Sequence, residues 1–270
     1  MSPIAVQEFP VPAGPLVPED LRVPWTWIDV LVFILLYLAG AFAVGILVTM
    51  GFAAFGITPQ HIQKSMTEQS LFSLLTQAAL DFAVLAYLVA QMRLQFGRPF
   101  WRTVGWRPLE TGNTPRTLAY LGLFFGGLIL AMMITLASAV SPPKGKMPVQ
   151  AFLQDRQIAF LFILMGVLLA PLVEETLFRG YLYPVLARSF GVSAGVLATG
   201  TLFGLLHAQQ LWGGWTQIGL LVVVGIVLTF ARAATGTVVA SYLLHLSYNS
   251  YQLIGFVVAS HGLRHLPMPQ

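Results

Sequence analysis

The sequence contains no cysteine and few charged residues. Without cysteine the chain cannot form a disulfide, use a thiol nucleophile or hold zinc through thiolates. It has 14 Lys and Arg and 10 Asp and Glu among 270 residues, a charged fraction of 9%. An average globular chain has about 25%. This scarcity excludes a water-soluble fold of this size and also a chain that is disordered throughout.

Hydrophobic residues make up 57% of the chain and occur in long runs. About 20 apolar residues cross the hydrocarbon core of a bilayer, so each run predicts a membrane helix. The predicted spans are residues 28–50, 71–92, 117–140, 157–178, 194–208, 215–231 and 236–259. We therefore expect an all-α, polytopic transmembrane bundle of about seven to eight helices, with residues 27–270 forming a single membrane domain that contacts the lipid bilayer.

Two segments differ from these spans. Residues 1–26 contain six prolines and predict an extended, disordered tail. Residues 93–116 interleave five arginines with four aromatic side chains, a pattern typical of an amphipathic segment in the headgroup region.

In a membrane protein, the net charge of +4 indicates how the loops are distributed between the two sides of the membrane. It does not indicate nucleic-acid binding, and no nucleic-acid partner is expected. Assigning the basic residues to alternate loops gives nine on the side of the N-terminus and five on the other. The positive-inside rule then predicts a cytoplasmic N-terminus. No pattern of a secretory leader opens the sequence, and we expect a multi-pass protein of the plasma membrane. The nine are Arg22, Arg93, Arg98, Arg102, Arg107, Arg116, Arg179, Arg188 and Arg232; the five are Lys64, Lys144, Lys146, Arg156 and Arg264.

Apart from Asp29 at the start of the first span, the charged residues inside the predicted spans are Asp81, Glu174 and Glu175, and Arg179 follows directly after the fourth span. An ionisable group near the centre of a bilayer costs at least about 2.5 kcal/mol, so adjacent glutamates require a reason. On a helix Glu175 and Arg179 are i, i+4 neighbours that can pair, whereas Glu174 is turned by about 100° and points elsewhere. The plainer interpretation is that the span ends here and its charges lie in the interface.

Two later spans carry histidines on a shared helix face with a second motif residue. His207 follows Phe203 at i+4, and His245 precedes Asn249 at i+4. A poorly solvated glutamate can take a proton from water and return it to a leaving amine, while imidazole and carboxamide groups stabilise an oxyanion. Alternatively, one Glu and two His could hold zinc and leave a position for water. The H-E-x-x-H zinc helix is absent.

Together, Glu174-Glu175-x-x-x-Arg179, Phe203-x-x-x-His207 and His245-x-x-x-Asn249 resemble the three motifs of the CAAX prenyl protease and bacteriocin-processing (CPBP, abortive-infection) family of intramembrane proteases. The resemblance covers about residues 157–255, the predicted catalytic core. It implies a helical membrane fold with a conical cavity open toward the cytosol, and glutamate-dependent hydrolysis of a peptide or protein substrate, with or without a lipid modification.

The resemblance also implies a role for each motif residue. Glu174 would activate water, Glu175 and Arg179 would support its orientation, and His207 would help to position the water. His245 and Asn249 would form the oxyanion site. Whether a divalent metal such as zinc takes part is left open by the resemblance.

This assignment requires Glu174 and His207 to lie within about 10 Å, the range of one bridging water. In two plain, straight crossings they would lie toward opposite faces of the membrane. We therefore expect the fourth span to tilt or to continue past Glu174 through Tyr181 and Pro184, which would place the glutamate deeper.

Three other interpretations remain open from the residues alone. Residues 191–195 match G-x-S-x-G, so Ser193 with His245 could form a serine protease dyad, although a serine there could also cap the following helix. The fold could instead serve as a non-enzymatic scaffold or immunity protein. Transport is the third, because Gln77 and Asp81 at i+4 could line an ion path; the structural alternative for Asp81 is an interhelical hydrogen bond.

Overall fold

The computed structural model describes residues 18–143, 145 and 147–266, and within these residues all regular structure is helical. The prediction of an all-α polytopic bundle is confirmed. The helices are α1 (Trp27–Ala54), α2 (Pro59–Lys64), α3 (Met66–Ala90), α4 (Phe100–Thr103), α5 (Arg116–Val140), α6 (Arg156–Leu164), α7 (Ala170–Glu175), α8 (Tyr183–Phe190), α9 (Val192–Leu206), α10 (Trp215–Thr235) and α11 (Val238–Ala259).

Each of the seven predicted spans corresponds to a helical segment, but they are not equivalent. Five segments are long and apolar enough to cross a membrane: Trp27–Ala54, Met66–Gln95, Arg116–Val140, Arg156–Phe190 and Trp215–Thr235. The other two are α9, an apolar helix of 15 residues, and α11, whose 22 residues include several polar side chains. Those polar side chains include two of the predicted site residues.

Local sequence explains where several helices begin and end. The Asp29 carboxylate accepts a hydrogen bond from the Thr26 backbone N–H at the start of α1, and the Asp155 carboxylate caps the start of α6 by accepting from the next backbone N–H groups. Gly236, in the left-handed conformation with φ of 69°, ends α10. Gly191, with φ of 88°, forms the sharp turn between α8 and α9.

The fourth span is one helical segment of 35 residues, from Arg156 to Phe190. It contains two π-helical stretches, Met165–Leu169 and Thr176–Leu182, on either side of α7. At about 1.5 Å per residue, Glu174 lies about 27 Å from the Arg156 end and about 24 Å from the Phe190 end, near the middle. The expectation that this span continues past Glu174 through Tyr181 and Pro184 is confirmed.

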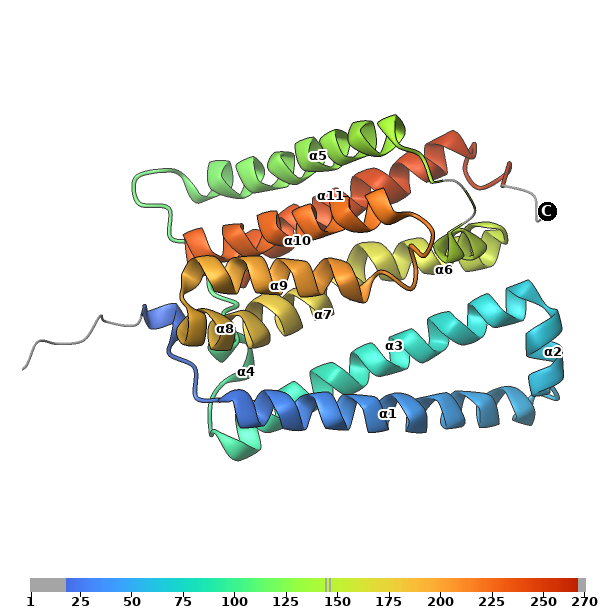
Figure 1. The fold of residues 1–270 in the computed structure, drawn as a ribbon, viewed down its shortest axis with the longest axis horizontal. Coiled ribbons are helices and arrows are strands. Elements are labelled where there is room, and N and C mark those ends of the chain that lie inside the picture. Colours follow the sequence, from blue (N-terminus) through green and yellow to red (C-terminus); the bar gives the residue numbers. More distant parts are fainter. Residues whose placement is uncertain (1–17, 144, 146, 267–270) are drawn as a thin grey trace, which may run out of the picture.

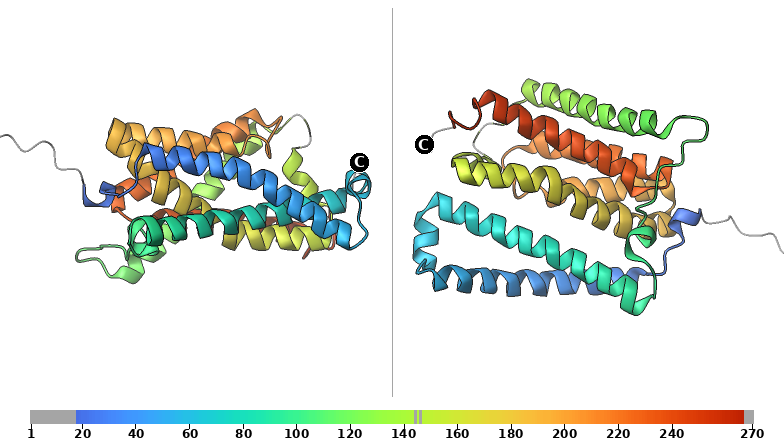
Figure 2. Two further views of the ribbon diagram at one scale, coloured as in Figure 1. Left: turned by 90° about the horizontal axis from the view of Figure 1, so that it is seen from below. Right: turned by 180° about the vertical axis from the view of Figure 1, so that it is seen from behind.

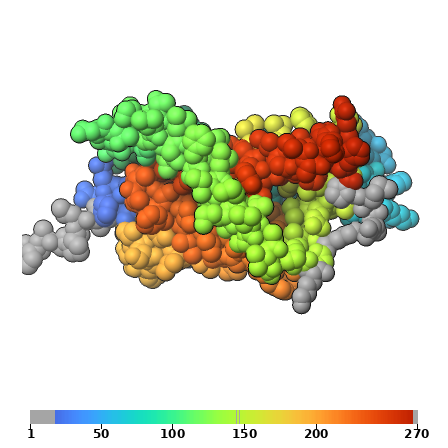
Figure 3. All heavy atoms as spheres, turned by 90° about the horizontal axis from the view of Figure 1, so that it is seen from above, coloured from blue at the N-terminus to red at the C-terminus, as the bar shows by residue number. Residues whose placement is uncertain are grey.

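The long helices run side by side with alternating direction, so the connections gather at two ends of the bundle (Figures 1 and 2). α1 and α3 form a hairpin at one edge, and α5 lies across α10 and beside α11 (Figure 3). We call one end the arginine end; it comprises residues 18–26, 93–116, 188–193 and 232–238. The opposite end, the cavity end, comprises residues 55–66, 141–143, 145, 147–156, 207–215 and 260–266.

The arginine end is densely packed, and the described part of the predicted N-terminal tail belongs to it. Residues 1–17 of that tail lie outside the described residues, but residues 18–26 differ from the prediction. The Trp25 side chain is fully buried, stacks on Tyr181 at 5.1 Å and donates its Nε1–H to the Tyr181 carbonyl. Asp20 pairs with buried Arg232 at 2.7 Å. These contacts hold a proline-containing segment that composition alone assigns to disorder.

The segment 93–116 closes the same end. It contains the end of the helix that follows α3, the short α4 and otherwise irregular chain. Phe100 and Val104 point into the core, while Arg93, Arg98 and Arg102 are exposed. The segment therefore covers this end of the bundle. Phe100 and Val104 pack against the core, and these three arginines face outward.

Two glycines at i, i+4, Gly200 and Gly204, allow α9 to lie close to α10. A Cβ at Gly200 would collide with the backbone at Ile226, and one at Gly204 would collide with Val222. Gly122 and Gly126 of α5 have the same spacing, but only Gly126 faces a neighbour, Leu244 of α11, whereas Gly122 has open space. Because α9 ends early, the connection after His207 lies beside a hollow in the bundle.

Candidate active site

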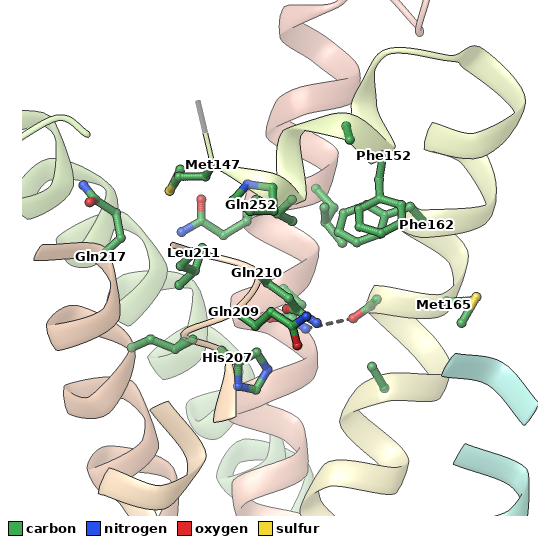
Figure 4. Close-up of a pocket in the computed structure, with 18 of the residues that line it drawn as sticks. Met147, Phe152, Phe162, Met165, His207, Gln209, Gln210, Leu211, Gln217 and Gln252 are labelled. Atoms are coloured by element: carbon green, nitrogen blue, oxygen red, sulfur yellow. Dashed lines mark hydrogen bonds between the residues drawn. The ribbon is translucent and has the colours of Figure 1, made fainter. Parts of the chain in front are cut away.

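A cavity of about 1100 Å³ occupies the half of the bundle next to the cavity end. Its walls come from the first half of α3, the end of α5, the α6–α7 segment, the α9–α10 connection, the start of α10 and the second half of α11. Figure 4 shows His207, Gln209, Gln210 and Gln252 on one side and the stacked rings of Phe152 and Phe162 on another. Glu174 and His245 also line this cavity.

Glu174 lies between two histidines that approach it from different helices. One carboxylate oxygen is 3.6 Å from Nε2 of His207, and the other is 3.7 Å from Nε2 of His245. The expectation that Glu174 and His207 lie within 10 Å is confirmed. About a quarter of the Glu174 side chain is exposed, 25%, so a water molecule from the cavity can reach it.

In each histidine, the hydrogen-bond partner of Nδ1 determines whether Nε2, the nitrogen that faces Glu174, can donate or accept. Nδ1 of His207 is 2.8 Å from the Phe203 carbonyl, and Nδ1 of His245 is 2.8 Å from the Glu175 carboxylate. Both partners only accept hydrogen bonds, so both Nδ1 atoms carry the proton. Each Nε2 that faces Glu174 is then an acceptor in the neutral ring and a donor in the imidazolium.

Glu175 faces the opposite way from Glu174 and is completely buried. It forms a 2.8 Å ion pair with Arg179, whose side chain also donates to Thr229 Oγ1 and to the Gly225 carbonyl of α10. The predicted i, i+4 pair is thus formed. Arg179 belongs to this buried network and not to a loop, so its assignment to the basic residues outside the spans was wrong.

Phe203 joins the buried network to the two histidines. The Arg179 guanidinium lies 4.4 Å from the centre of the Phe203 ring. The same ring is 4.8 Å from the His207 ring and meets the His245 ring edge to face at 5.6 Å. Cation–π and aromatic packing of this kind limits the orientations available to both imidazoles.

Asn249 lies one turn beyond His245 on α11 and also lines the cavity. Its side-chain amide donates to the Gly166 carbonyl at 2.8 Å. Gly166 belongs to the π-helical stretch 165–169, where the i→i+4 pattern of backbone bonds is altered. One of the two amide N–H groups is used in this contact, which leaves the second for another acceptor.

Asp81 of α3 lines the same cavity as Glu174. Its carboxylate accepts a 2.8 Å hydrogen bond from Gln77 of the same helix. The structural alternative of an interhelical bond is therefore wrong, because the bond is intrahelical. The i, i+4 spacing in the sequence identifies the Gln77–Asp81 pair. It does not reveal that this pair lines the same cavity as Glu174.

Ser193 does not meet His245. It is exposed in the first turn of α9, after Gly191 rather than at the cap position. Phe203, the neighbour of His245, lies ten residues further along, about 15 Å at 1.5 Å per residue. The Ser193–His245 dyad is contradicted by this geometry.

The three side chains Glu174, His207 and His245 include the donor types that zinc prefers, and the outer nitrogens have partners of the kind that orient metal-binding histidines. Among the residues that the structure describes, however, no group of three or more such side chains is placed to hold a metal ion. The donor types therefore fit zinc, whereas their present spacing does not.

Comparison with known proteins adds a family to this geometry. The family described as type II CAAX prenyl endopeptidase Rce1-like matches residues 156–251, from the start of α6 into α11. This segment, about a third of the chain, is similar to the Rce1-like family. The resemblance inferred from the three motifs is confirmed for this segment, and the apolar helices are those of a multi-pass membrane protein. No curated protein and no solved structure matches the chain.

The Rce1-like segment contains all six predicted site residues, but several contacts that support them were not anticipated. Thr229 and Gly225 hold Arg179, and the Gly166 carbonyl holds Asn249. The spacing of Gly225 and Thr229 at i, i+4 in the sixth span is a signal that could have located the first contact. The second depends on a π-helical distortion that no sequence pattern marks.

Proposed function

We propose that this protein is an intramembrane endopeptidase that hydrolyses a peptide bond with a water activated by Glu174. The proposal is supported by one arrangement above others: a partly exposed carboxylate between two Nε2 atoms, at the end of a cavity large enough for a peptide segment. Glu175, the neighbouring acid, is completely buried and serves to hold Arg179 and His245.

In the proposed reaction Glu174 takes a proton from water as the oxygen attacks the scissile carbonyl. His207 helps to position that water. The oxyanion accepts hydrogen bonds from the second amide N–H of Asn249 and from Nε2–H of His245 in its imidazolium form, which Glu175 stabilises through Nδ1–H. Glu174 then returns the proton to the leaving amine, so protons balance over the cycle.

The remaining parts of the proposal concern location and substrate. We place the protein in the plasma membrane with the described N-terminal segment on the cytoplasmic side, and we take the substrate to be a peptide or protein segment. Prenylated and unmodified segments are both candidate substrates. A non-enzymatic scaffold or immunity role would use the same fold without cleavage.

Purified protein in lipid nanodiscs would be incubated with prenylated C-terminal peptides and with unmodified membrane peptides. Glu174→Ala and His207→Ala should lose cleavage, while Ser193→Ala should retain it because Ser193 is remote from the cavity. Undiminished cleavage by Glu174→Ala would refute the proposal. Absence of cleavage of every peptide by the wild type would favour the scaffold.

The role of a metal needs its own arm of the experiment. Wild-type protein would be treated exhaustively with a chelator and then assayed with and without added Zn²⁺. The glutamate–water reaction as written predicts unchanged activity after chelation. Loss of activity that Zn²⁺ restores would show that a metal supplies the activated water.

A further inference from the structure

Asp81 is the second carboxylate that lines the cavity, and the proposed reaction does not use it. At 1.5 Å per residue it lies about 22 Å from the Met66 end and about 21 Å from the Gln95 end of its span, near the middle. Glu174 also lies near the middle of its segment, which packs beside α3 (Figure 1). The two acids therefore face one cavity from neighbouring helices at mid-bundle.

The two carboxylates have different partners. Glu174 lies between Nε2 of His207 and Nε2 of His245, at 3.6 and 3.7 Å. Within the described part of the chain Asp81 forms no ion pair; one of its oxygens accepts from Gln77, and the other has no hydrogen bond. Asp81 is nevertheless only 8% exposed. A carboxylate that is buried at membrane depth is stabilised by a cation, so the empty position beside Asp81 suits a positively charged group.

The rest of the lining supplies no such group. The described residues that line the cavity include no lysine and no arginine. Two histidines are among them, His207 and His245, but both direct Nε2 toward Glu174. The field on this side of the cavity is therefore that of an unpaired carboxylate, which attracts cations and repels anions.

The polar groups on the same wall can also accept hydrogen bonds. Gln77 donates one amide N–H to Asp81, so its carbonyl oxygen is left for a donor from outside the protein. Ser70 and Ser73 continue the lining of α3 toward the cavity end. A lysine ammonium or an arginine guanidinium carries several N–H donors and no acceptor. The carboxylate of Asp81 and the carbonyl of Gln77 together match such a head group.

We propose that Asp81 and Gln77 form a subsite for a basic side chain of the substrate, a lysine or arginine close to the scissile bond. The inference rests on the proposed peptidase function, because it names the class of peptide that the same cavity takes. Since Asp81 and Glu174 both lie at mid-bundle, the basic residue is a near neighbour of the cleaved bond. An acidic side chain at the same position is repelled by both carboxylates.

Peptides with lysine, norleucine or glutamate at one position would be compared in lipid nanodiscs, with that position moved stepwise around the cleaved bond. Norleucine keeps the length of the lysine side chain and removes its charge. At the position that meets Asp81, we expect kcat/KM to fall about five-fold from lysine to norleucine, the size of a partly screened ion pair. Glutamate should lower it further. Asp81→Asn should bring the lysine and norleucine values together.

Glu68→Gln is the matched control, because Glu68 is an acid of the same helix that does not line the cavity. This variant should keep the wild-type preference for lysine. Equal kcat/KM for lysine and norleucine at every position overturns the subsite. A preference that persists in Asp81→Asn overturns it as well, because the charge of Asp81 is then not its cause.

A binding measurement separates this inference from the proposed function. Fluorescently labelled lysine and norleucine peptides would be titrated against Glu174→Gln protein, in which Asp81 is the remaining acid among the described lining residues. The lysine peptide should bind with a Kd about five-fold lower, and a further Asp81→Asn substitution should abolish the difference. If the wild type cleaves no peptide, the proposed function fails, but this preference still decides the subsite. Equal Kd values for both peptides overturn it.

Discussion

The two halves of the bundle differ in how they use their polar residues. Toward the arginine end, buried polar groups are paired with one another. Arg179 pairs with Glu175, Arg232 pairs with Asp20, and the Trp25 indole donates to a backbone carbonyl. Toward the cavity end they line an open space, among them Gln77, Gln210 and Asn249. The polar groups of one half hold the helices together, and those of the other remain accessible to a ligand.

Glu174 and Glu175 meet at the boundary between these halves. They are adjacent in sequence, yet one side chain is 25% exposed to the cavity and the other is completely buried. The turn of about 100° between neighbouring helical residues is sufficient to assign them to different tasks. Substitutions on either side of this boundary should therefore affect either stability or catalysis.

The largest expected effect on stability comes from Arg179→Met. It leaves the Glu175 charge buried without its partner, which typically costs about 3–5 kcal/mol. Reversible unfolding in mixed micelles would measure the loss. Arg116→Met, at an exposed position, is the control and should change little. A combined Glu175→Leu and Arg179→Met variant should recover part of the loss; failure to recover any would contradict the ion-pair explanation.

Trp25→Ala should have the next largest effect, since it empties a fully buried site at the arginine end. Removing a buried tryptophan typically costs about 3 kcal/mol. The unfolding measurement should show this loss, while the rate of cleavage by the folded fraction stays within about two-fold. Trp212→Ala at the cavity end, 61% exposed, is the control. Equal destabilisation by Trp25→Ala and Trp212→Ala would contradict the inference that the arginine end is the more densely packed of the two ends.

A bulky side chain in the cavity should impair substrate binding without lowering stability. Ser73 is exposed and lines the cavity, so Ser73→Trp should obstruct the substrate and raise KM by roughly ten-fold without lowering stability. Thr67→Trp, exposed on the same helix but away from the lining, is the matched control. Equal kinetics for both variants would show that this part of the cavity does not bind substrate.

Asp81→Asn should have the smallest effect. The amide oxygen of asparagine can still accept the bond from Gln77, and only the charge near Glu174 is lost. We expect kcat/KM to change by less than about ten-fold. A loss comparable to that of a Glu174 variant would place Asp81 in the reaction itself.

The sequence was sufficient for the helices and for the six motif residues, because apolar runs, i, i+4 spacing and misplaced charges are local signals. Other features depended on distant contacts. Trp25 and Asp20 lie in a proline-containing segment whose order comes from Tyr181 and Arg232. The short α9 indicates a hollow only once α10 is seen to extend beyond it. The cavity itself became visible only from the three-dimensional positions of the segments that line it.

The central claim is that Glu174 performs chemistry while Glu175 maintains structure. Glu174→Gln and Glu175→Gln would be compared in nanodiscs for single-turnover cleavage and for unfolding. We predict that Glu174→Gln loses about 10²- to 10⁴-fold in rate, the usual contribution of a general base, with unchanged stability. Glu175→Gln should be destabilised. Cleavage at the wild-type rate by stable Glu174→Gln protein would contradict the account.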